Sequence, residues 1–209
     1  RIQSYLKLQQ IEQKINIFDY ISGVDYGDLS VVPGYILETY KKIEEGLAPV
    51  VNEGIIPISL GGDHSMTLGE LRAIAKKHGP VALLQFDAHS DTWDSYFEQK
   101  YNHGTVFRRA IEEGLIDVSR SIQIGMRGGL YGIEDLEDAK NLGLALYTTN
   151  EYKKLGVERM LDIIATLEAT GHSFQRSDKT SIQKGETDEY VDEIEIYVTR
   201  SVKCYLDLN

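Results

Sequence analysis

Histidine and aspartate residues gather in three short stretches in the first half of the chain. His64 follows one apolar run, and His103 lies further along. Between them, Asp87, His89 and Asp91 stand at alternate positions after a second apolar run. Imidazole and carboxylate groups make a mixed ligand set that suits Mn²⁺, Fe²⁺ or Zn²⁺ and is too rich in nitrogen for a Ca²⁺ site. The residue types and their spacing therefore indicate a divalent metal site.

Each of these side chains also has an ordinary structural explanation. A histidine such as His64 is often held by hydrogen bonds alone, and an isolated Asp87 or Asp91 could cap a loop. Alternate residues of an extended strand share one face but spread over about 13 Å in five residues. The Asp-x-His-x-Asp group can therefore bind one ion only if the chain curls as it leaves the strand.

The elements around this group predict a strand–helix–strand unit. Residues 55–60 form a short apolar run that we expect to be a strand. A helix over residues 67–78 should follow, with Thr67 and Glu70 as a capping box at its start. Residues 81–86 form a second apolar run, typical of a strand covered on both faces. Ligands of open α/β sheets bind outside the carboxyl ends of the strands, which is where the histidine and the aspartates stand.

The same alternation continues along most of the chain. Helices are expected over residues 35–52, 105–113, 132–141 and 157–167, and strands over residues 121–125, 144–147, 194–198 and 202–206. The fold class is therefore α/β, with three α/β/α layers around a mainly parallel sheet. Residues 1–209 are interpreted as one domain, in which residues 171–195 form a polar, acidic, loop-like segment.

The composition excludes several classes of protein. The 209 residues carry 33 Asp and Glu against 22 Lys and Arg, a formal charge of −11. Such a field disfavours nucleic acid and favours cations. No apolar run approaches the roughly 20 residues that span a bilayer, so we expect no membrane partner. The single Cys204 suits a reducing compartment, and we expect the cytoplasm.

Several stretches in this order resemble the signatures of the ureohydrolase family, which includes arginase, agmatinase, guanidinobutyrase and proclavaminate amidinohydrolase. The principal ones are residues 60–65 (LGGDHS), 86–91 (FDAHSD) and 102–105 (NHGT). Residues 24–28 (VDYGD), 107–110 (FRRA) and 123–128 (QIGMRG) resemble the agmatinase-like branch in particular. The resemblance covers residues 23–165 and implies the arginase fold.

The resemblance also implies a binuclear manganese hydrolase. His64, Asp87 and Asp91 would bind one Mn²⁺, and Asp87 and His89 the other, with Asp87 as the bridge. A hydroxide between the two ions would attack the guanidinium carbon of a cationic substrate such as agmatine or guanidinobutyrate and release urea. His103 would carry protons. The resemblance further implies a homo-oligomer, a trimer or a hexamer.

One part of the family pattern is missing. A second signature with two further aspartate ligands should follow on a later strand, but the candidate positions hold Ser201 and Lys203, or Asp207 and Asn209. Because only four of the six expected ligands are present, we expect a domain that is incomplete at its C-terminal end, a weakly held second metal and impaired hydrolysis. The alternative function is a non-catalytic, metal-deficient relative. A deacetylase-like amidohydrolase of the same general fold ranks lowest.

Overall fold

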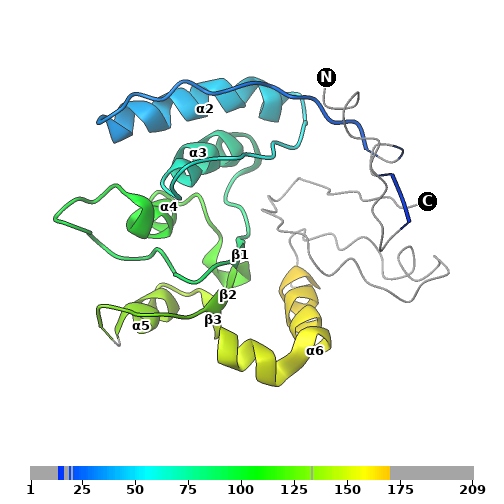
Figure 1. Cartoon of the computed structure of the whole chain (residues 1–209), viewed down its shortest axis with the longest axis vertical. Coiled ribbons are helices and arrows are strands. Elements are labelled where there is room, and N and C mark those ends of the chain that lie inside the picture. The colour runs from blue at the N-terminus through cyan, green and yellow to red at the C-terminus, as the bar shows by residue number, and fades with distance from the viewer. Residues whose placement is uncertain (1–13, 17–18, 20, 133, 170–209) are drawn as a thin grey trace. The chain divides into compact units, whose positions relative to one another are not determined.

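The computed structural model describes residues 14–16, 19, 21–132 and 134–169 (Figure 1). The chain divides into two compact units. The described part of the smaller unit comprises residues 14–16, 19 and 21–28. The described part of the larger unit, residues 29–132 and 134–169, contains every helix and strand named below and all the candidate site residues.

The centre of the larger unit is a parallel three-stranded sheet in the order β1–β2–β3. The strands are β1 (Leu84–Phe86), β2 (Ile122–Met126) and β3 (Ala145–Thr148). Gln85 lies opposite Gln123 in the register of β1 and β2. The five residues of β2 are buried or nearly so, which explains why its sequence is almost continuously apolar.

Helices cover both faces of this sheet (Figure 1). They are α2 (Ile36–Asn52), α3 (Met66–His78), α4 (Val106–Glu112), α5 (Glu134–Asn141) and α6 (Thr149–Ala169), with two short 3₁₀ turns, η2 (His103–Thr105) and η3 (Val118–Arg120). Leu83 packs into a cluster with Leu68 of α3 and Phe107 of α4, whereas its neighbour Leu84 packs with Met160 of α6. Alternate residues therefore face opposite layers, and the predicted α/β fold with a parallel sheet is confirmed. None of the helices in the described residues is long and apolar enough to cross a bilayer.

The prediction of a strand over residues 55–60 is wrong. These residues form no strand, and Ile58 and Leu60 are 83% and 96% exposed. An apolar run becomes a strand only where a neighbour accepts its backbone hydrogen bonds. Within the described residues β1 is paired with β2 alone, and Pro57 has no amide hydrogen to donate.

The predicted capping box of α3 is also wrong. The helix begins at Met66 with Ser65 as its N-cap, and Thr67 is buried within the first turn. The carboxylate of Asp63 accepts the amide hydrogen of Ser65 at 2.8 Å, so the turn before the helix is closed from the preceding loop. The expected strands over residues 194–198 and 202–206 lie outside the described residues.

Candidate metal centre

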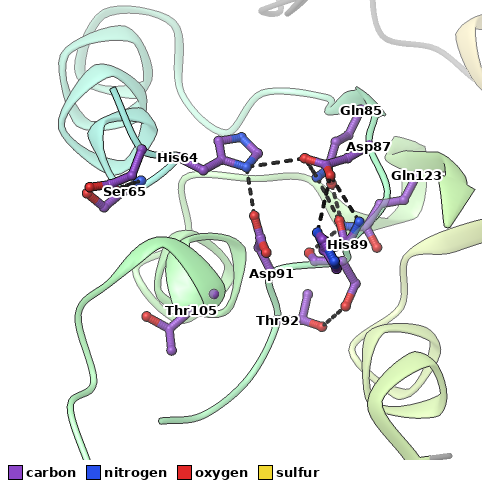
Figure 2. Close-up of polar contacts among 12 residues, drawn as sticks. His64, Ser65, Gln85, Asp87, His89, Asp91, Thr92, Thr105 and Gln123 are labelled. Carbon is purple, nitrogen blue, oxygen red and sulfur yellow. Dashed lines mark hydrogen bonds and ion pairs between the residues drawn. The ribbon is translucent and has the colours of Figure 1, made fainter. Parts of the chain in front are cut away.

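Three of the predicted ligands meet at the carboxyl edge of the sheet. His64 lies in the turn before α3, and Asp87 and Asp91 lie in the loop that leaves β1 (Figure 2). His64 Nδ1 is 2.7 Å from Asp91 Oδ2 and 3.4 Å from Asp87 Oδ2. One ligand atom from each of the three residues lies within 4.8 Å of the others, and all three side chains are only partly exposed.

The loop after β1 curls, as the ligand spacing requires. Asp91 has a φ of 51°, a left-handed conformation that is uncommon for residues other than glycine and that turns its side chain back toward His64. Main-chain hydrogen bonds fix the curl. The amide of Asp87 donates to the carbonyl of Ile124, and the amide of Phe107 donates to the carbonyl of Asp91. Strain of this kind is concentrated at functional sites.

A glycine in β2 makes room for this loop. Gly125 has a φ of 98° at a bulge in the ladder with β3, and a Cβ there would stand 3.1 Å from the carbonyl oxygen of Asp87. Arg127 holds the same corner, because its amide donates to the carbonyl of Ala88 and its guanidinium donates to the carbonyl of Gly125. Gly125 therefore permits the close approach of the loop to β2.

The donor chemistry of the group fits a divalent cation. Burial by itself lowers the pKa of His64, but the hydrogen bond to Asp91 and the charges of Asp91 and Asp87 outweigh it and raise the pKa above its usual value. A proton on Nδ1 can serve only one of the two facing carboxylates well, whereas a cation could be shared by all three donors. The other ring nitrogen, Nε2, is buried and has no hydrogen-bond partner among the described residues.

The other two predicted site residues are more exposed. The side chain of His89 is 58% exposed, and its Nδ1 lies 3.9 Å from Asp87 Oδ1, on the side of the carboxylate away from His64. His103 is the first residue of η2 and is exposed, and its ring makes an edge-to-face contact with the ring of Tyr96 at 5.5 Å between centroids. Neither residue belongs to the three-residue group.

Aromatic side chains cluster beside His103. The ring of Tyr96 stacks on Trp93 at 5.1 Å, and Tyr131 makes an edge-to-face contact with Trp93 at 5.3 Å between centroids. The hydroxyls of Tyr96 and Tyr131 are 3.4 Å apart. We call Trp93, Tyr96 and Tyr131 the aromatic wall.

Sequence reasoning missed two buried polar residues under the ligand loop. Gln85 and Gln123 are 2% and 0% exposed and hydrogen-bond to each other and to the loop. Their signal in the sequence was a single polar residue within each apolar strand. The positions considered for the second aspartate pair, Ser201 and Lys203 or Asp207 and Asn209, lie outside the described residues.

Comparisons with known proteins identify the family of the chain. The sequence model of the arginase family matches residues 1–174. Guanidinopropionase from Pseudomonas aeruginosa is 42% identical over 149 residues, which are 71% of this chain and 46% of that protein. Guanidinobutyrase from the same organism is 42% identical over 134 residues, which are 64% of this chain and 42% of that protein. The chain thus spans less than half the length of these two curated relatives.

A solved structure extends the likeness to three dimensions. Proclavaminate amidinohydrolase from Streptomyces clavuligerus superposes with a TM-score of 0.63 at 36% sequence identity, covering 72% of this chain and 50% of that one. The family match over most of the chain, the shared α/β fold and the histidine and aspartates at the sheet edge all lead to one conclusion. The chain belongs to the arginase family, the ureohydrolases.

Proposed function

We propose that this chain is part of a manganese-dependent amidinohydrolase that releases urea from a cationic guanidino compound. The observation that carries the proposal is the convergence of His64, Asp87 and Asp91 within 4.8 Å at the carboxyl edge of the sheet. The relatives named guanidinopropionase and guanidinobutyrase support the substrate class.

The chain's own residues divide into two ligand sets. His64, Asp91 and one oxygen of Asp87 would hold the first Mn²⁺, and the other oxygen of Asp87 with His89 would hold the second. The two oxygens of Asp87 already face opposite ways, toward His64 and toward His89. Bound Mn²⁺ supplies the positive charge that makes water acidic enough to act as a nucleophile near neutral pH.

His103 is proposed as the residue that carries protons. Cleavage of the guanidinium carbon–nitrogen bond leaves an amine that must gain a proton, and imidazole exchanges protons readily near neutral pH. His103 is exposed and its ring contacts Tyr96 of the aromatic wall, which supports a role in exchanging protons with solvent.

The aromatic wall and the charge of the chain support a cationic substrate. Faces of tryptophan and tyrosine attract guanidinium and ammonium groups, and the net charge of −11 attracts cations at long range. Agmatine and guanidinobutyrate both present a guanidinium on an aliphatic chain, and we propose substrates of this kind. From the resemblance we also propose a homo-oligomer, a trimer or a hexamer, and from the single Cys204 a cytoplasmic location.

Urea release and metal content test this proposal together. The 209-residue chain should be loaded with Mn²⁺ and incubated with agmatine and with guanidinobutyrate. We expect one firmly held Mn²⁺ per chain, a second that is held weakly, and slow urea release that is lost in Asp87→Asn and reduced in His103→Asn. Metal binding without urea from either compound would favour the non-catalytic alternative. A chain that binds no Mn²⁺ would contradict the proposed function.

A further inference from the structure

Two buried glutamine side chains form a chain of hydrogen bonds that ends on a metal ligand. Gln123 of β2 donates through Nε2 to Oε1 of Gln85 at 2.6 Å and to the carbonyl of Ser90 at 2.7 Å. Gln85 of β1 donates through its own Nε2 to Oδ2 of Asp87 at 3.2 Å and to the carbonyl of His89 at 3.1 Å (Figure 2). Among the described residues, every hydrogen-bond partner of the two side-chain amides is therefore either the other amide or the ligand loop.

Burying two glutamine side chains within strands carries a free-energy cost. A buried amide group costs free energy unless it is hydrogen-bonded. The Oε1 atom of Gln123 is buried without a partner among the described residues, so part of that cost is not recovered. Apolar residues occupy the neighbouring strand positions, including Leu84 and Ile122. A pair of amides at these two sites is thus explained by what it does to the loop rather than by packing.

The acceptors around the two glutamines determine which way each side-chain amide group is oriented. The amide group of Gln123 faces two acceptors, Oε1 of Gln85 and the carbonyl of Ser90, which fixes its orientation. With its Oε1 occupied by Gln123, Gln85 must turn its amide hydrogens toward Asp87. Gln123 therefore determines which end of the Gln85 side chain meets the carboxylate.

The two carboxylate oxygens of Asp87 consequently accept hydrogen bonds from different groups. Oδ2 accepts from Gln85 and lies 3.4 Å from Nδ1 of His64. Oδ1 accepts the backbone amide of His89 at 2.9 Å. Both donors are neutral, so they orient the carboxylate without cancelling the negative charge that attracts a cation. A lysine or arginine in the place of Gln85 would instead compete with the cation.

We propose that Gln85, oriented by Gln123, is a positioning residue that fixes the Asp87 carboxylate and so prepares the ligand group for a divalent cation before the cation arrives. The inference rests on the proposed metal site but not on hydrolysis. Partners that orient metal ligands in this way typically account for a factor of about 10–100 in metal affinity.

The test compares Gln85→Met, Gln123→Met and the double variant, because methionine keeps the length of the side chain without its hydrogen bonds. The probe is Mn²⁺ alone, and its dissociation constant is measured by electron paramagnetic resonance of the free ion. We expect Gln85→Met to raise the dissociation constant about 10-fold or more and Gln123→Met to raise it less. The double variant should resemble Gln85→Met, because the two residues act in series.

Ser121→Ala is the matched control. Ser121 is 1% exposed in the loop just before β2, and its hydroxyl accepts from the amide of Leu83 and donates to the carbonyl of Asp117, at the opposite end of the strand from the ligands. Its loss should destabilise the fold and leave the affinity for Mn²⁺ unchanged.

The hydrogen-exchange rate of the His89 backbone amide in the metal-free protein is a second measurement, which a purely structural role of Gln85 would not change. The amide of His89 donates to Asp87, so it should exchange faster in Gln85→Met and at an unchanged rate in Ser121→Ala. Equal affinity in Gln85→Met and wild type, or an equal loss in Ser121→Ala, would overturn the inference. If wild type binds Mn²⁺ without releasing urea and Gln85→Met weakens that binding, the inference stands and the proposed hydrolysis fails. If wild type binds no Mn²⁺, both fail.

Discussion

The carboxylate of Asp91 lies 2.7 Å from Nδ1 of His64, although the two residues are 27 positions apart in the sequence. His64 precedes α3 and Asp91 follows β1, so this contact exists only when the helix is packed on the sheet. The ring of Phe107 from α4 meets the His64 ring edge to face at 5.1 Å, and the amide of Phe107 holds the carbonyl of Asp91. Three separate segments thus hold the two candidate metal ligands, His64 and Asp91, in place.

Replacing Asp91 should remove most of the metal affinity. Asp91→Asn preserves the shape of the side chain but exchanges a charged oxygen for a neutral amide, so we expect the dissociation constant for Mn²⁺ to rise more than about 100-fold, beyond the usual effect of outer partners. Isothermal titration calorimetry measures the change. Asp138→Asn on the exposed side of α5 is the control and should bind as wild type does. Unchanged binding in Asp91→Asn would exclude this residue as a ligand.

A side chain at Gly125 should destabilise the fold. Gly125→Ala places a Cβ at a φ of 98° and 3.1 Å from the carbonyl oxygen of Asp87, and we expect a loss of about 2 kcal/mol in the free energy of unfolding. Urea denaturation followed by circular dichroism measures it. Gly129→Ala has nothing within 4 Å of the added Cβ and should stay within about 0.5 kcal/mol of wild type. Similar losses in both variants would contradict the close approach at Gly125.

Lys77, which belongs to the neighbouring helix α3, caps the C-terminal end of α2 with hydrogen bonds. Its Nζ donates to the carbonyls of Val51 and Asn52 at 2.5 and 2.8 Å, where the helix dipole is negative. Lys77→Met should lower the free energy of unfolding by about 1 kcal/mol, as measured by thermal denaturation. Lys76→Met should have little effect, because the 77% exposed side chain of Lys76 makes only a 3.6 Å contact with Glu44. A larger effect at Lys76 would refute this assignment.

Asp117 should make stability depend on pH in the acidic range. Burial raises the pKa of its carboxyl, but hydrogen bonds from Ser119 and the charge of Arg120 outweigh it and hold the pKa below its usual value. The carboxylate therefore stabilises the fold above the pKa of about 3.9 that it has in the unfolded chain, and this contribution is lost as the pH falls through the lower value of the folded state.

Asp117→Asn retains an acceptor for the amide of Ser119 but loses the ion pair with the buried Arg120. We expect it to lower the free energy of unfolding by about 1–2 kcal/mol at pH 7. The difference from wild type should diminish below about pH 4. Urea denaturation at a series of pH values measures both effects. In an Arg120→Met background the same substitution should cost less, and an equal cost there would mean that the ion pair is not the cause.

The long periodic elements were predictable from the sequence. The helices over residues 36–52 and 66–78 agree with their predicted bounds within a residue at either end, because each buries a stripe of apolar side chains. The three parallel strands also fall within the predicted runs or one residue beyond them. The place of the ligands followed from topology, since both His64 and Asp87 come at the carboxyl edge of the sheet.

Structural features that depend on residues distant in the sequence could not be predicted from local sequence patterns. The apolar run over residues 55–60 forms no strand, because no strand in the described part of the chain pairs with it. The left-handed turn at Asp91 is held by the amide of Phe107 and the ring of His64, both of which are distant in the sequence. The amide chain through Gln85 and Gln123 depends on strand register, which is set in three dimensions.

The long sequence separation between His64 and Asp91 has an energetic consequence. In the unfolded chain these donors are far apart, and no site exists there for a cation to occupy. A cation that joins His64, Asp87 and Asp91 therefore binds the folded chain alone, and its binding free energy adds directly to that of folding. The ion would connect the segments at α3 and β1, so the fraction of folded protein would depend on the metal concentration.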